Sequence, residues 1–187
     1  LSPTLGDGSV SSVSKLSANR GRVARAGQVL AGDEWGDSVA TLPDVDGDGA
    51  GELMVGTHNG DYADILFLSS PADGEAPTVH AGVRLSASAN SALPAAMRAR
   101  IVGASNWGSS LACVGDPDGD GAVSLAFAAP TDGAGGRDQS GAIFIVKMQR
   151  GPRLLRMGVS GSPPASAPAV TVASWAPVQT TSAAILS

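Results

Sequence analysis

The sequence predicts an all-β fold built from four-stranded antiparallel units, and three observations support this prediction. Two acidic, glycine-containing loops of nearly the same sequence lie 72 residues apart, at 44–52 and 116–124. Each loop is preceded by a Trp-Gly-x-Ser segment, at 35–38 and 107–110. Short apolar runs bounded by Gly, Pro, Asp and Ser surround both loops, which is typical of strands. The chain is therefore interpreted as a repeat protein.

The predicted strands follow the same order in both repeats. In the first repeat they are 39–42, 53–56, 65–68 and a weaker segment at 78–81. In the second repeat they are 111–114, 125–128, 142–146 and a weaker segment at 153–156. Four short strands per repeat is the composition of a β-propeller blade. We therefore expect two consecutive four-stranded sheets within residues 31–157, with Trp35 and Trp107 at equivalent buried positions near the blade junctions.

The rest of the chain is divided by comparison with these two units. Residues 8–16 and 22–25 align with the third and fourth strands of a unit. The predicted parts are the C-terminal half of a preceding blade (1–30), two complete blades (31–103 and 104–159), and a Pro/Ser/Ala-rich linker with one further strand at 169–173 (160–187). Closed propellers have about four to eight blades. We therefore expect a sector of a larger propeller, from a processed product or a fragment, since the chain does not begin with Met.

The acidic loops have the composition of calcium sites. Each places three carboxylates on alternate residues, with glycines that permit a sharp turn, so that the side chains can converge on one ion. They are not EF-hand loops, because the twelfth position is Val55 or Phe127, inside an apolar run, instead of Glu. A late ligand is available at the ninth position as Glu52 in the first loop, but only as Ser124 in the second. We therefore expect two Ca²⁺ sites, the second weaker.

The predicted ligands can be stated residue by residue. In the first loop they are Asp44, Asp46, Asp48, the Ala50 carbonyl and Glu52. In the second they are Asp116, Asp118, Asp120, the Ala122 carbonyl and Ser124, with water. Solvated Asp-Gly turns are the alternative interpretation. The net charge is −5 and the two loops contribute −7, so the acidity belongs to these loops and nothing favours nucleic-acid binding.

The order of these segments resembles the FG-GAP repeat, which builds the propeller of integrin alpha chains and of many secreted proteins. Trp-Gly stands where that family has Phe-Gly, residues 128–130 match its Gly-Ala-Pro, 56–58 match more loosely, and 141–145 match its third strand. The resemblance covers residues 5–157. It implies an extracellular or cell-surface module that recognises a protein or glycan, mediates adhesion or helps to assemble a surface structure. FG-GAP-like propellers also accompany secreted hydrolases, lyases and phospholipases, so the non-catalytic part of such an enzyme is the alternative.

The sequence offers no catalytic site. Cys113 lies in an apolar run and is interpreted as a small buried hydrophobe. His58 is assigned to a turn, and no metal-binding partners are found for His80. No nucleophile elbow, zinc-protease motif or phosphate loop is present, and no apolar run is long enough for a transmembrane helix. We expect a protein that is not an enzyme, has no membrane span and contacts further propeller blades or a protein or glycan partner.

Two long connections are candidate binding surfaces. They span 86–102, where a short helix is expected within 94–100 after its proline, and 130–140. In the FG-GAP family these connections share the face opposite the calcium loops. Arg98, Arg100 and Arg137 are the candidate binding residues, because the planar guanidinium suits carboxylate or sulfate groups. Surface insertions are also tolerated without a function, so both interpretations stay open.

Overall fold

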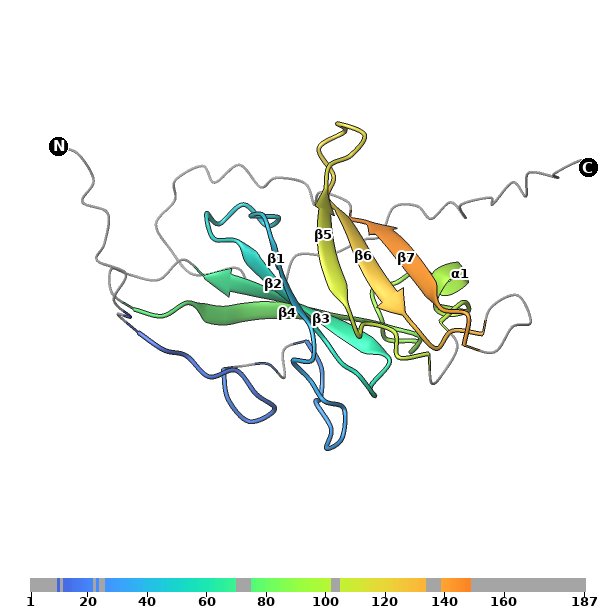
Figure 1. Ribbon diagram of the computed structural model, residues 1–187. Helices are drawn as coiled ribbons and strands as arrows, with labels where there is room; N and C mark the ends of the chain where they lie inside the picture. Colours follow the sequence, from blue (N-terminus) through green and yellow to red (C-terminus); the bar gives the residue numbers. More distant parts are fainter. Residues whose placement is uncertain are drawn as a thin grey trace, which may run out of the picture.

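The chain folds into two antiparallel β-sheets and one short helix, in a computed structural model of residues 1–187 (Figure 1). The structure describes residues 10, 12–21, 23, 26–69, 75–101, 105–133 and 139–148. The prediction of an all-β fold is confirmed, since the only helix of the described residues is α1 (Ala95–Arg98). No helix among these residues is long and apolar enough to cross a membrane.

The first sheet has four strands, as expected, and they pair in chain order. It comprises β1 (Val39–Leu42), β2 (Glu52–Gly56), β3 (Tyr62–Ser69) and β4 (Thr78–Ser86). The strand β4 continues five residues beyond the predicted segment 78–81. The added part contains Arg84, which lies opposite Asp64 of β3 and forms an ion pair with it. That pair makes a polar position compatible with a buried strand.

The second sheet repeats the first three strands. It comprises β5 (Leu111–Gly115), β6 (Ser124–Ala129) and β7 (Ala142–Lys147), again paired in chain order. The predicted fourth strand, 153–156, and the predicted strand 169–173 lie outside the described residues. At the N-terminus, described residues 12–16 form no strand, so that part of the prediction is wrong; a single bridge joins Ser17 to Arg20 there.

The two sheets pack face to face around the main apolar core. Trp107 is fully buried between them and stacks on Phe127, with ring centroids 4.5 Å apart and planes tilted by 10°. Its ring also meets Phe144 edge-on at 6.3 Å. Met54 and Ile65 of the first sheet complete this core and are completely buried. The contact between the sheets therefore depends mainly on the aromatic side chains of the second repeat.

The Trp-Gly turns of the two repeats have the same backbone structure. The Gly36 N–H donates to the Gly56 carbonyl at 2.9 Å, and the Gly108 N–H donates to the Ala128 carbonyl at 2.9 Å. Both turn glycines have positive φ, 101° and 95°, which favours glycine over any residue with a Cβ. The equivalence expected for Trp35 and Trp107 is thus present in the backbone. Their burial differs, because Trp35 is only half-buried and packs on the side of the first sheet that faces away from the second.

Candidate metal centre

The first acidic loop, between β1 and β2, is folded around its own aspartates. The Asp44 carboxylate accepts hydrogen bonds from the N–H groups of Gly47 (2.6 Å), Asp48 (3.1 Å) and Gly49 (3.0 Å). The carboxylates of Asp44, Asp46 and Glu52 bring one oxygen each within 4.8 Å of one another. This spacing places three of the predicted ligands around one point. The direction of the Ala50 carbonyl remains a prediction.

Glu52 is the buried ligand candidate at the end of the first acidic loop. Its side chain is 1% exposed, although it begins the strand β2. One carboxylate oxygen accepts from the Leu68 N–H at 3.0 Å and the other from the Val45 N–H at 3.4 Å. Burial raises the pKa of Glu52 to about 7, and the neighbouring Asp46 adds to the shift. A buried carboxylate next to further carboxylates is costly to ionise unless a cation lies beside it.

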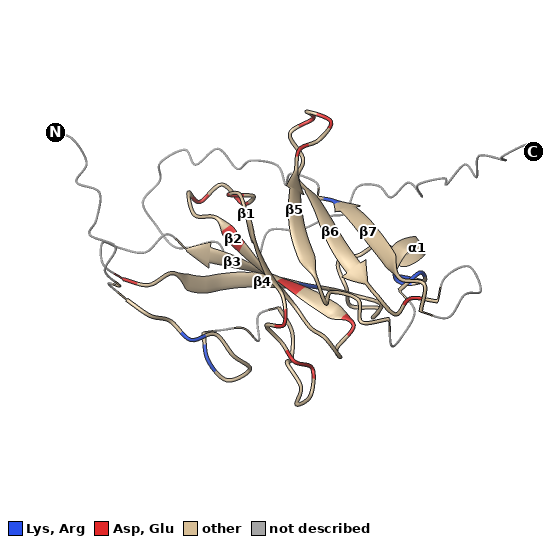
Figure 2. Ribbon diagram, viewed as in Figure 1, with Lys and Arg blue, Asp and Glu red and all other residues tan. Residues whose placement is uncertain are grey.

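The second loop, between β5 and β6, has the same backbone plan. The Asp116 carboxylate accepts from the Asp120 N–H (3.1 Å) and the Gly121 N–H (2.7 Å), as Asp44 does from Asp48 and Gly49. Asp116, Asp118 and Asp120 also bring one oxygen each within 4.8 Å of one another. All three side chains are exposed. Acidic residues gather in this loop and in the first, and both loops project from the same edge of the stacked sheets (Figure 2).

Lys147 is a difference between the loops that the sequence analysis missed. It ends β7 opposite Ser124, and its ammonium lies 2.5 Å from Asp118 and 2.6 Å from Asp120. The hydrogen bond from Lys147 lowers the pKa of Asp118. Ser124 is buried and brings no carboxylate, so the second loop has a protein cation where the first has a buried acid. A metal ion would have to displace the ammonium, which favours the predicted ranking of the two sites.

His80 lies beside the first loop, so the expectation that it has no metal-binding partners is wrong. It projects from β4, with its Nε2 3.0 Å from an Asp46 oxygen and its Nδ1 3.9 Å from an Asp48 oxygen. Burial raises the pKa of Asp46 above its ordinary value. The sequence separates His80 from this loop by two strands, so only the pairing of β2, β3 and β4 brings them together.

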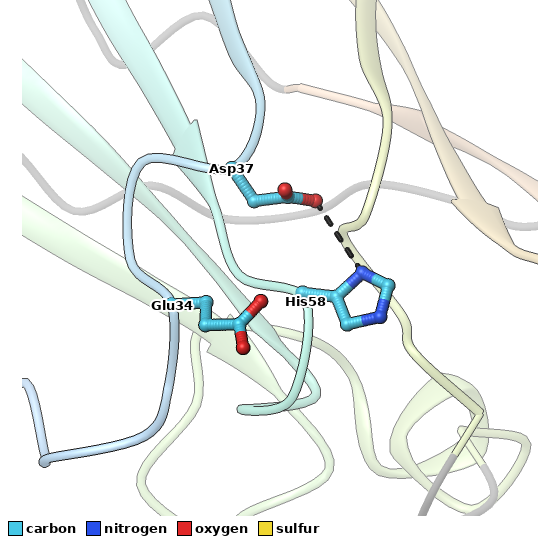
Figure 3. Close-up of side chains that lie close together, drawn as sticks. All are labelled: Glu34, Asp37 and His58. Atoms are coloured by element: carbon cyan, nitrogen blue, oxygen red, sulfur yellow. Dashed lines mark ion pairs between the residues drawn. The ribbon is translucent and has the colours of Figure 1, made fainter.

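A third cluster lies away from both loops and also escaped the sequence analysis. Glu34 and Asp37 flank the first Trp-Gly turn, and His58 follows β2 (Figure 3). The His58 Nδ1 is 3.6 Å from an Asp37 oxygen, and Glu34 accepts a hydrogen bond from the Asn59 side chain at 3.0 Å. The side chains of His58 and Asp37 are 46% and 38% exposed. His58, which the sequence analysis assigns to a turn, therefore lies close to Glu34 and Asp37, and all three side chains are accessible to solvent.

The predicted binding surface is described only in part. Arg98 belongs to α1 and donates to the Ala89 carbonyl at 2.9 Å, so it holds its own connection together. Met97 of the same helix is buried in the core. Arg137 lies outside the described residues. Cys113 is half-buried in β5 and packs against the core, which agrees with a small apolar side chain.

Comparisons with known proteins assign no family to the chain. No protein-family model matches the chain, and no curated protein matches it.

Proposed function

We propose that the chain is a calcium-stabilised part of a β-propeller that resembles the FG-GAP repeat and acts in recognition or assembly outside the cell. The observation that carries this proposal is the repetition of one acidic loop. Two loops 72 residues apart hold their first aspartate by equivalent backbone hydrogen bonds and gather three carboxylates each. Solvated turns need no such convergence of like charges, which repel one another unless a cation compensates them, as Lys147 does in part at the second loop.

The donor set fits calcium. Calcium takes six to eight oxygen ligands and tolerates flexible geometry. The first loop offers four carboxylates, of which Glu52 is buried and already fixed by two backbone hydrogen bonds. When bound, calcium supplies the positive charge that lets these carboxylates ionise together. The site is therefore structural, and its effect is to hold β1 to β2 and β5 to β6 at the loop end.

The exposure of the loops supports an extracellular setting. Calcium sites of extracellular modules bind in the range of about 10⁻⁴ to 10⁻³ M. A loop whose carboxylates also accept hydrogen bonds from their own backbone, and which is largely exposed, suits that range better than a tight cytosolic site. The long connection containing α1 lies on the same scaffold and supports a role in binding a protein or glycan partner.

Titration calorimetry of the full chain with CaCl₂ tests the proposal. We expect two sites, with the first loop binding at least about tenfold more tightly, equivalent to about 1.4 kcal/mol. Asp46→Asn should abolish the tighter site and Asp118→Asn the weaker one. Lys147→Met should strengthen the weaker site, because it removes the competing ammonium.

The matched control is Glu75→Gln, which removes an exposed acid outside all three carboxylate clusters and should change neither affinity. Equal affinities at the two loops would contradict the ranking. The absence of any binding heat in the wild-type chain, with no calcium retained in equilibrium dialysis, would contradict the site assignment.

A further inference from the structure

Large apolar side chains of the described residues are exposed both in the part of the chain up to β1 and on the second sheet. In the first part they are Val10, Val13, Leu30 and Val39, of which Val39 belongs to β1 and lies opposite Val55. On the second sheet they are Val114, Ile143 and Ile145. Ile143 and Ile145 share one face of β7, and contiguous exposed apolar side chains usually mark an interaction surface.

The outer face of the second sheet is apolar across all three strands except at its loop end, where Lys147 forms ion pairs with the second acidic loop. Ile145 lies opposite Ala126, which lies opposite Ala112, and Ile143 lies opposite Ala128. Ile143 is 74% and Ile145 43% exposed. A solvated face of an antiparallel sheet normally carries polar side chains. This face, defined by these five residues, therefore lacks the composition of a surface that stays in water.

The internal repeat shows what such a face contacts. The pair Ala126–Ile145 of the second sheet corresponds to Met54–Ile65 of the first. The pair Ala128–Ile143 corresponds in the same way to Gly56–Ala63. In the first sheet Met54, Ile65 and Ala63 are at most 1% exposed. Gly56 is also closely packed, because a Cβ at that position would clash with the Gly108 carbonyl. The second sheet covers them, with Trp107 and Phe127 at the centre of the contact.

The opposite end of the chain carries the equivalents of the covering residues. Trp35 and Val55 correspond to Trp107 and Phe127, and they lie on the side of the first sheet that faces away from the second. Leu16 and Ala26 pack on that side only in part, since Trp35 and Leu53 remain half-buried and Val39 is 62% exposed. The chain thus has one half of the sheet-to-sheet contact at each end.

We infer that the outer face of the second sheet docks the N-terminal end of a second copy of this chain, head to tail. The contact repeats the interface already formed between the two sheets, and it buries the apolar side chains exposed at both ends. Such a contact is heterologous, so it produces a closed ring or an open chain of copies. The inference goes beyond the proposed calcium sites and holds even if the loops bind no ion.

Sedimentation velocity of the full chain over a range of concentrations tests this inference. The wild-type chain should associate reversibly. Ile143→Lys, which disrupts the outer face, and Val39→Lys, which disrupts the exposed side of the first sheet next to Val55, should each be monomeric. An equimolar mixture of the two variants should form a dimer and nothing larger, because each retains one intact end. Asn90→Lys, on an exposed loop, is the matched control and should associate as the wild type does.

Far-ultraviolet circular dichroism checks that each variant is folded. We expect Ile143→Lys to fold, because the Ile143 side chain is highly exposed. A wild-type chain that stays monomeric at every concentration would overturn the inference and would assign the face to the chain's own remaining residues or to another partner. Association of Val39→Lys alone would also overturn it, because two outer faces would then meet each other.

Discussion

Trp107→Ala is expected to destabilise the protein by about 3–5 kcal/mol, a large share of the about 5–15 kcal/mol by which an ordinary domain is stable. The indole is fully buried between the sheets and contacts Phe127 and Phe144. Its removal leaves a cavity at the centre of the only large contact between the sheets in the described residues. Urea unfolding followed by circular dichroism measures the loss.

Two variants make this prediction specific. Trp107→Phe should cost much less than alanine, because a ring remains and because the Trp107 Nε1 is buried without a hydrogen-bond partner among the described residues. Trp35→Ala should also cost less, since Trp35 is half-buried, although it loses a hydrogen bond to Asp64. Equal losses for Trp35→Ala and Trp107→Ala would contradict the assignment of Trp107 as the main contact.

Asp64→Ala is expected to cost about 3–5 kcal/mol, the usual effect of removing one partner of a buried ion pair. Asp64 is completely buried and accepts from Arg84 at 2.8 and 2.9 Å and from the Trp35 indole at 3.0 Å. Burial opposes the charge of Arg84, but the hydrogen bonds and charge of Asp64 keep the pKa of Arg84 above its ordinary value. Without Asp64 the guanidinium, which also stacks on the Tyr62 ring, loses its compensating charge.

A double variant separates the charge from the packing. Asp64→Leu with Arg84→Met should recover most of the stability lost in Asp64→Ala, because an apolar pair replaces the ions together. Asp118→Ala, at an exposed ion pair, should have a far smaller effect. Urea unfolding of the three variants and of the wild-type chain measures these losses. A double variant as unstable as Asp64→Ala would show that the loss comes from packing and not from an uncompensated charge.

The sequence predicted the strands and the acidic loops well because both depend on local patterns. Short apolar runs between turn residues located the seven described strands, and the Asp-Gly spacing located the loops, whose first aspartates bind their own backbone. The short helix after Pro94 followed in the same way from the fixed φ of proline.

The contacts that the sequence did not predict depend on strand register. His80 and Lys147 reach the acidic loops from β4 and β7, and Arg84 meets Asp64 across a pair of strands. None of these pairs has a characteristic spacing in the sequence, because a shift of one residue would turn each side chain to the other face. The half-buried state of Trp35 likewise depends on what covers the first sheet, which its own sequence does not specify.

The most direct test of calcium stabilisation is the free energy of unfolding of the full chain with and without calcium. It is measured by urea titration at pH 7.5, in CaCl₂ and in EDTA, with MgCl₂ as the control for ionic strength. Calcium at about one hundred times the dissociation constant of the first-loop site should add about 2.7 kcal/mol through that site, and Asp46→Asn should lose this contribution. An unfolding free energy that is the same in calcium, magnesium and EDTA would contradict the account.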